Sequence, residues 1–124
     1  MRLPLDTLVI LWWLDDAPDL SEEAKRLLAS ADAVHISAVS PWEITFKQYF
    51  GLLEGPGDPA ERVRDLAFPG LPVTAAHGVR AGRLPMVHED PFDRLLVAQA
   101  QVHRLALVTR NDWIPQYDVT VVRV

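Results

Sequence analysis

Short apolar segments alternate with helix-forming segments along the chain, and this alternation restricts the fold more than any other feature of the sequence. Strand-like segments span residues 3–5, 33–37, 70–73, 105–109 and 119–124. The segments between them carry helical patterns that begin at capping residues. Strands that alternate with helices form a parallel sheet with helices packed on its faces. The pattern therefore predicts a fold of the α/β class with a sheet of short strands.

The predicted helices begin at recognisable sequence signals. Ser40-Pro41 and Asp90-Pro91 each pair a capping residue with a proline suited to the first helical turn. A loop is expected at residues 54–59, which are dense in glycine and proline. The expected helices span residues 8–14, the segment from Ser21 to about Leu28, the segment from Ser40 to before Gly51, and residues 60–66, 74–81 and 91–100.

The chain of 124 residues fits a single domain, residues 1–124, and its 49% hydrophobic content suffices for a core. It contains no cysteine, which excludes disulfides, thiolate metal sites and thiol nucleophiles. The net charge of −5 argues against a protein that coats nucleic acid through bulk positive charge. The sequence offers no stretch of about 20 apolar residues, the length that a membrane span needs. We expect a cytoplasmic protein.

Acidic residues follow the predicted strands or begin the predicted helices. Asp6 follows the first strand, Glu43 lies just after the second, Asp93 begins the helix before the strand at 105–109, and Asn111-Asp112 follows that strand. Because the carboxyl ends of parallel strands meet at one edge of a sheet, these side chains can converge. Carboxylates in close proximity repel one another, and a hard divalent cation holds them together in the ionised form. The sequence therefore predicts a metal site that acts on phosphates.

Some of these acids have a competing structural role. Asp6 stands where it could cap the helix at residues 8–14. Asp90 precedes Pro91 and is interpreted mainly as a cap, which leaves Asp93 for the metal. The four histidines are scattered over different elements, which argues against a histidine metal cage. Trp42 is expected to pack in the core.

Four segments together resemble a known family. They are residues 5–14 (LDTLVILWWL), 40–44 (SPWEI), 90–100 (DPFDRLLVAQA) and 107–111 (LVTRN). In this order and at this spacing they resemble the PIN-domain ribonucleases and, among these, the VapC-type toxins of bacterial toxin–antitoxin pairs. The resemblance implies a three-layer α/β/α fold and a Mg²⁺- or Mn²⁺-dependent endoribonuclease. It also implies inhibition by a VapB-like antitoxin and a homodimer.

The resemblance assigns roles to individual positions. Asp6 and Asp93 match the acids that bind the metal directly, and Glu43 matches the acid of the helix after the second strand. The fourth acidic position falls on Asn111, where many relatives carry aspartate. Either Asp112 supplies the fourth carboxylate or the site works with three. Both residues are kept as candidates.

Three residues are candidates for contact with the substrate. Thr109 matches a hydroxyl residue found near the site in the family, and Arg94 and Arg110 are candidate phosphate contacts. A guanidinium group suits bidentate contact with phosphate.

The expected reaction is hydrolysis of phosphodiester bonds in single-stranded or loop RNA, with a metal-activated water as the attacking group. Glu43 or Asp112 would orient or deprotonate that water. Two alternatives come from other functional classes: a metal-dependent DNA nuclease or phosphatase, and a PIN-like binding protein whose catalysis is impaired by Asn111. A receiver-like domain is disfavoured because Arg110 stands where that class places a lysine after a late strand.

Overall fold

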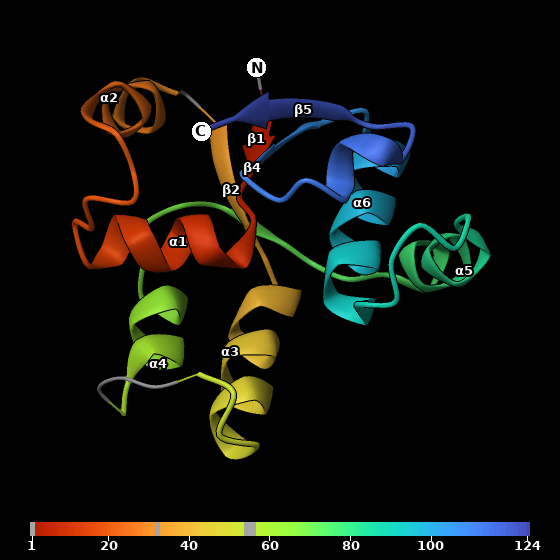
Figure 1. The fold of residues 1–124 in the computed structure, drawn as a ribbon, viewed down its shortest axis with the longest axis horizontal. Helices are drawn as coiled ribbons and strands as arrows, with labels where there is room; N and C mark the ends of the chain where they lie inside the picture. The colour runs from red at the N-terminus through yellow and green to blue at the C-terminus, as the bar shows by residue number, and fades with distance from the viewer. Residues whose placement is uncertain (1, 32, 54–56) are drawn as a thin grey trace.

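The computed structural model describes residues 2–31, 33–53 and 57–124 (Figure 1). Within them, β1 (Arg2–Pro4), β2 (Ala33–Ser37) and β3 (Gly70–Leu71) pair in parallel. A second parallel pair is formed by β4 (Ala106–Thr109) and β5 (Thr120–Arg123).

The two groups of strands meet between β1 and β4. Leu5 and Val108 form a parallel bridge, and the backbone N–H of Asp6 donates to the carbonyl of Val108 at 2.9 Å. The strands therefore follow the order β3-β2-β1-β4-β5, and the carboxyl ends of β1 and β4 lie side by side.

Helices cover both faces of this sheet (Figure 1). One core cluster joins residues of α1, α2 and α4 to β1 and β2, and the other joins α6 and a 3₁₀ segment, η1, to β4. Neighbouring residues of β4 divide between the clusters: Val108 belongs to the first and Leu107 to the second. The three-layer α/β/α fold is thereby confirmed. The helices are α1 (Thr7–Leu14), α2 (Glu22–Ser30), α3 (Val39–Tyr49), α4 (Pro59–Arg64), α5 (Ala75–Arg83), α6 (Pro91–His103) and η1 (Ile114–Gln116).

Most predicted elements are present, and the main differences lie at their ends. α3 begins at Val39, after Ala38, so Ser40 is not its N-cap. The Ser40 hydroxyl instead lies 2.9 Å from the hydroxyl of Thr7 and ties the first turns of α3 and α1 together. η1 was not predicted. Residues 54–56 of the predicted loop lie outside the described residues, and α4 begins at Pro59.

The very apolar segment after Asp6 forms α1, a helix of 8 residues that packs against the sheet. In the described parts of the chain, no helix has both the length and the apolar character that crossing a membrane requires.

Candidate active site

Asp6 lies at the carboxyl end of β1, where the bridge to β4 holds its backbone. Asp6 occupies the N-cap position of α1, but its side chain makes no capping hydrogen bond to that helix within the described residues. Instead, the hydroxyl of Thr109 at the end of β4 donates to Asp6 Oδ2 at 2.7 Å. Burial raises the pKa of Asp6, the hydrogen bond from Thr109 opposes this, and the nearby charge of Glu43 adds to it. The sheet thus holds a desolvated carboxylate at its edge.

Glu43 lies one turn into α3, on a face that packs toward the sheet. The contact between Ser40 and Thr7 fixes the start of this helix beside α1. Glu43 is 4% exposed, and its Oε2 accepts a hydrogen bond from Lys47 Nζ at 2.5 Å. Its other oxygen, Oε1, is buried and has no hydrogen-bond partner among the described residues. A buried oxygen without a hydrogen-bond partner destabilises the folded protein, so this side chain can gain a further donor or a cation at low cost.

Asp93 lies in the first turn of α6, and the cap of that helix positions it. Asp90 Oδ1 accepts from the backbone N–H groups of Phe92 at 2.9 Å and Asp93 at 3.3 Å. The expected capping role of Asp90 is therefore confirmed. Because Asp90 supplies the cap, the Asp93 side chain is left to face the edge of the sheet.

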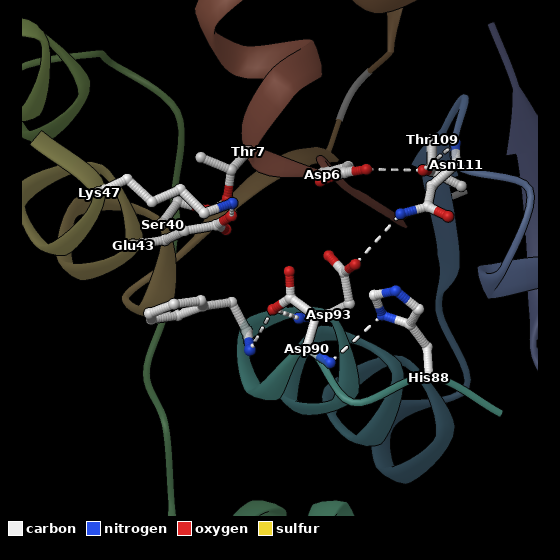
Figure 2. A network of polar contacts seen from close by, with 11 residues as sticks. Asp6, Thr7, Ser40, Glu43, Lys47, His88, Asp90, Asp93, Thr109 and Asn111 are labelled. Atoms are coloured by element: carbon white, nitrogen blue, oxygen red, sulfur yellow. Dashed lines mark hydrogen bonds and ion pairs between the residues drawn. The ribbon is translucent and has the colours of Figure 1, made fainter. Parts of the chain in front are cut away.

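The carboxyl groups of Asp6, Glu43 and Asp93 face a common space between α1, α3 and α6 (Figure 2). Burial, followed by the charges of Asp6, Asp90 and Glu43, raises the pKa of Asp93 to about 8, against a weaker opposing effect of Lys47. A carboxyl group so perturbed indicates that several acids share one poorly solvated region. The structure therefore brings together the three acids expected to converge.

The donor set fits a divalent cation. Three buried carboxyl groups offer hard oxygen ligands, and Glu43 Oε1 lacks a partner in the described structure. As the side chains stand, no group of three histidine, aspartate or glutamate residues in the described ranges is arranged around one ion position. Glu43 binds Lys47 instead, which is one reason why the three acids do not surround one ion position. Asp6, Glu43 and Asp93 would hold the ion after a change of side-chain conformation.

Asn111 links Asp93 to the end of β4. Its Nδ2 donates to Asp93 Oδ2 at 3.1 Å, its Oδ1 accepts from the N–H of Trp113 at 2.8 Å, and its own N–H donates to Thr109 Oγ1 at 2.9 Å. Thr109 in turn donates to Asp6. Thr109 and Asn111 thus orient two of the acids. Thr109 is fully buried, so it supports the site instead of contacting a substrate.

Asn111→Asp is expected to tighten Mn²⁺ binding and to destabilise the metal-free protein. The new carboxylate would still accept from Trp113, but it would lose the donor to Asp93 and add a like charge beside it. We expect Mn²⁺ affinity to rise about 10-fold, measured by calorimetry, since ligand charge governs the affinity of such sites. Asn111→Ser, which adds no charge, is the control. Unchanged or weaker Mn²⁺ binding by Asn111→Asp would show that this side chain does not face the ion.

Asp112 does not join the acidic cluster. Its side chain is 83% exposed and forms an ion pair with Arg123 of β5. The one-residue step from Asn111 to Asp112 directs the two side chains to different surroundings. The structure therefore gives no support to Asp112 as the fourth carboxylate or as the base that acts on water.

The two arginines predicted to contact the substrate have other partners. Arg94 is buried and donates to the carbonyl groups of Pro85 at 3.0 Å, Ala81 at 2.8 Å and Leu84 at 2.9 Å. It holds the end of α5 against α6, so the prediction that it contacts phosphate is not supported.

Arg110 is tied to backbone carbonyl groups and to an aromatic ring. It donates to the carbonyl of Val124 at 2.8 Å and to that of Asp19, and its guanidinium lies 4.5 Å from the centroid of the Trp12 ring. Arg110 also borders a hollow of about 230 Å³ that includes Asp6 and Asn111. It remains a candidate for contact with a ligand that enters there.

Lys47 is the residue near the site that the sequence analysis missed. It is four residues after Glu43 on α3, and its ammonium binds that carboxylate. Glutamate followed by lysine at this spacing on a helix is a recognised pairing pattern, and it could have identified the contact. The pair places a positive charge inside the acidic region.

Comparisons with known proteins agree with this architecture. The structure is similar to VapBC2 from Rickettsia felis bound to a promoter DNA fragment, at 17% identity and a TM-score of 0.71, covering 99% of this chain and 98% of the other. It is similar to FitAcB from Neisseria gonorrhoeae, at 20% identity and a TM-score of 0.68, covering 97% and 96%.

A toxin–antitoxin complex from Klebsiella pneumoniae is similar at 25% identity and a TM-score of 0.60, covering 90% of this chain and 87% of the other. No curated protein sequence matches the chain. The sequence model of the PIN domain matches residues 4–119, which include the three acids, β2 and β4. With the acids gathered at the edge of a β3-β2-β1-β4-β5 sheet and nearly the whole chain matched, this protein belongs to the PIN domain family.

Proposed function

We propose that this protein is a VapC-type toxin, a metal-dependent endoribonuclease that hydrolyses phosphodiester bonds of single-stranded or loop RNA. The observation that carries the proposal is the buried group of Asp6, Glu43 and Asp93, in which the pKa of Asp93 is raised to about 8. Clustered acids without enough counter-charge are destabilising, and a site of this kind is explained by a cation that it binds. Membership of the PIN family supports nuclease activity.

The residues of the chain have distinct tasks in the proposed reaction. When bound, Mg²⁺ or Mn²⁺ would supply Lewis acidity and stabilise the charge that develops on the phosphoryl oxygens. Asp6, Glu43 and Asp93 would hold the ion, and Thr109 and Asn111 fix the orientation of the Asp6 and Asp93 carboxyl groups. Glu43 keeps one oxygen without a hydrogen-bond partner in the described structure, and with one oxygen on the ion the other would be free to accept a proton from an attacking water.

Single-stranded RNA is the substrate class that suits this site. The bases of a single strand or loop are accessible, whereas the major groove of an A-form helix is too narrow for side chains. Lys47, which binds Glu43, borders a groove of about 610 Å³ that Trp42 and Phe46 also line, and the exposed rings of these two residues can stack on unpaired bases.

An antitoxin partner is proposed from the apolar surface of α3, and the homodimer stays an expectation from the family resemblance. Trp42 was expected in the core, but it is 54% exposed, and Phe46, Tyr49 and Phe50 are exposed beside it. Exposed aromatic patches on a small protein mark surfaces that bind partners. The similar structures include a toxin–antitoxin complex and VapBC2, so a VapB-like antitoxin is the partner proposed for this chain.

The test is incubation of the purified protein with three substrates: a single-stranded RNA, a DNA of the same sequence and a phosphomonoester. We expect internal cleavage of the RNA alone, dependent on Mg²⁺ or Mn²⁺ and abolished by a chelator. Asp6→Asn, which keeps the size of the side chain, is the control for a contaminating nuclease.

Three results would contradict the proposal. Cleavage of DNA at an equal rate would favour the DNA nuclease, and release of phosphate from the monoester would favour the phosphatase. If calorimetry detects no Mn²⁺ binding and no substrate is cut, the protein is a binding protein that has lost catalysis.

A further inference from the structure

Lys47 places an ammonium group inside the region where the acids converge. Its Nζ lies 2.5 Å from Glu43 Oε2, and the two side chains are 33% and 6% exposed. The charges of Asp90 and Asp93 also attract this ammonium. Lys47 is therefore the cation that partly neutralises the acids in the structure as it stands (Figure 2).

The contact leaves Glu43 only half satisfied. One oxygen binds Lys47, and the other is buried without a partner among the residues described. A carboxylate held in this way is turned toward its own helix, because Glu43 and Lys47 are one turn apart on α3. This conformation agrees with the finding that the acids of the described chain do not yet surround one ion position.

The surroundings of Lys47 offer its ammonium a second location. Lys47 borders the groove of about 610 Å³ beside Trp42 and Phe46, and its Nζ lies 5.9 Å from the centroid of the Phe92 ring. A lysine side chain has a flexible stem and a compact charge, so its head can move while its stem stays packed. One rearrangement of this side chain can therefore carry the charge from the acids to the groove.

We propose that Lys47 is an internal counter-ion that the divalent cation displaces from Glu43, and that the released ammonium then binds a phosphate of the RNA in the adjacent groove. The inference rests on the proposed function, because it assumes that the three acids bind a metal ion. Two cations on the oxygens of a single carboxylate repel each other strongly in a poorly solvated site. Once Glu43 turns to the metal ion, Lys47 loses its partner, and an RNA phosphate restores one.

The first experiment follows the Lys47 ammonium in the wild-type protein by ¹⁵N-edited NMR during titration with Mg²⁺. The only other lysine of the sequence, Lys25, pairs with Asp16 and Glu22 on the surface and serves as the internal reference. We expect the slowly exchanging signal of the ion-paired Lys47 to disappear as Mg²⁺ binds, while Lys25 is unaffected. A Lys47 signal that persists at saturating Mg²⁺ would overturn the inference.

The second experiment compares Lys47→Met with Lys47→Arg. Methionine keeps the packing of the stem without the charge, so Mg²⁺ should bind about 10-fold more tightly, measured by calorimetry. For RNA cleavage at saturating Mg²⁺, KM should rise about 10-fold, more than kcat falls, because a phosphate contact is lost. Lys47→Arg should have a KM close to that of the wild-type protein. Lys25→Met controls for the loss of a distant positive charge.

The outcomes separate this inference from the proposed function. The role of Lys47 would be refuted, and the nuclease left intact, if the protein binds Mg²⁺ and cleaves RNA while the Lys47 signal is undisturbed. The same conclusion would follow if Mg²⁺ affinity and KM are unchanged in Lys47→Met. Absence of Mg²⁺ binding in the wild-type protein would refute both. The NMR measurement uses the wild-type chain, so it gives a result even if Lys47→Met fails to fold.

Discussion

Asp93→Asn is expected to abolish RNA cleavage and, at the same time, to stabilise the metal-free protein. Loss of a metal-binding carboxylate should lower the cleavage rate on the order of 10³-fold or more, because stabilisation by the ion contributes several kcal/mol to the transition state. The gain in stability has a separate cause. Asparagine keeps an acceptor for Asn111 but removes a charge that burial and the other acids disfavour.

The stabilising effect of Asp93→Asn should depend on pH. The pKa of Asp93 is about 8 in the folded protein, above its ordinary value of 3.8, so the folded state binds a proton more tightly than the unfolded state. The wild-type protein therefore loses stability as the pH rises from about 4 to about 8. The advantage of Asp93→Asn should grow over that range to a few kcal/mol, on the order expected for such a shift. Urea unfolding with a chelator at pH 5 and pH 8 measures it.

The matched control is Asp90→Asn, on the same helix three residues earlier. Asparagine is as good an N-cap as aspartate, so this variant should keep α6 and retain cleavage. Two results would count against the assignment of Asp93: full cleavage activity in Asp93→Asn, or a metal-free Asp93→Asn protein that is less stable than wild type at pH 8.

Thr109→Val should reduce both stability and cleavage. The Thr109 hydroxyl donates to Asp6 in a buried contact and accepts from the N–H of Asn111 in a partly buried one. Without it, the buried carboxylate loses a donor, which costs about 1–3 kcal/mol in the free energy of unfolding. Metal affinity and activity should fall about 10- to 100-fold, as is usual when a group that orients a metal ligand is lost.

Thr109→Ser separates the hydroxyl from the methyl group. Serine retains the donor to Asp6, so this variant should keep most of the activity and of the metal affinity. Chemical denaturation, Mn²⁺ calorimetry and RNA cleavage are compared across the three proteins. Equal loss in Thr109→Ser and Thr109→Val would show that packing of the methyl group, and not the hydrogen bond to Asp6, determines the effect.

The sequence predicted the positions of the three acids because backbone rules determine them. Asp6 follows a strand, Glu43 lies in a helix that directly follows a strand, and Asp93 begins a helix behind a capping Asp90. Parallel pairing then places these points at one edge of the sheet, whatever the side chains in between. Both the α/β class and the location of the site follow from this pattern.

The backbone rules that located the acids do not predict where side chains point or which residues they contact in the folded protein. Asn111 and Asp112 are adjacent in sequence, yet one bonds to Asp93 and the other pairs with Arg123. Arg94 looked available for a phosphate, but the last turn of α5 and the two residues after the helix supply three carbonyl groups that only the packed structure reveals. Polar residues find their partners through tertiary packing, which local patterns do not encode.

Trp42 shows the corresponding limit for apolar residues. It was expected in the core, but its ring packs on the partly exposed Phe46 and on Phe92, with centroids 6.4 and 4.8 Å apart. An aromatic residue that packs against a partner protein or a base has the same sequence signature as one that fills a core. The exposed face of α3 could be recognised only after the sheet and helices were placed.

The proposed activity requires that Asp6, Glu43 and Asp93 together bind one divalent ion. The most direct test is diffraction from crystals soaked in Mn²⁺, with data collected at the manganese absorption edge. We expect an anomalous peak within about 2.0–2.4 Å of an oxygen from each of the three carboxyl groups. An ion bound elsewhere, or the absence of a peak at a concentration that saturates binding in solution, would contradict it.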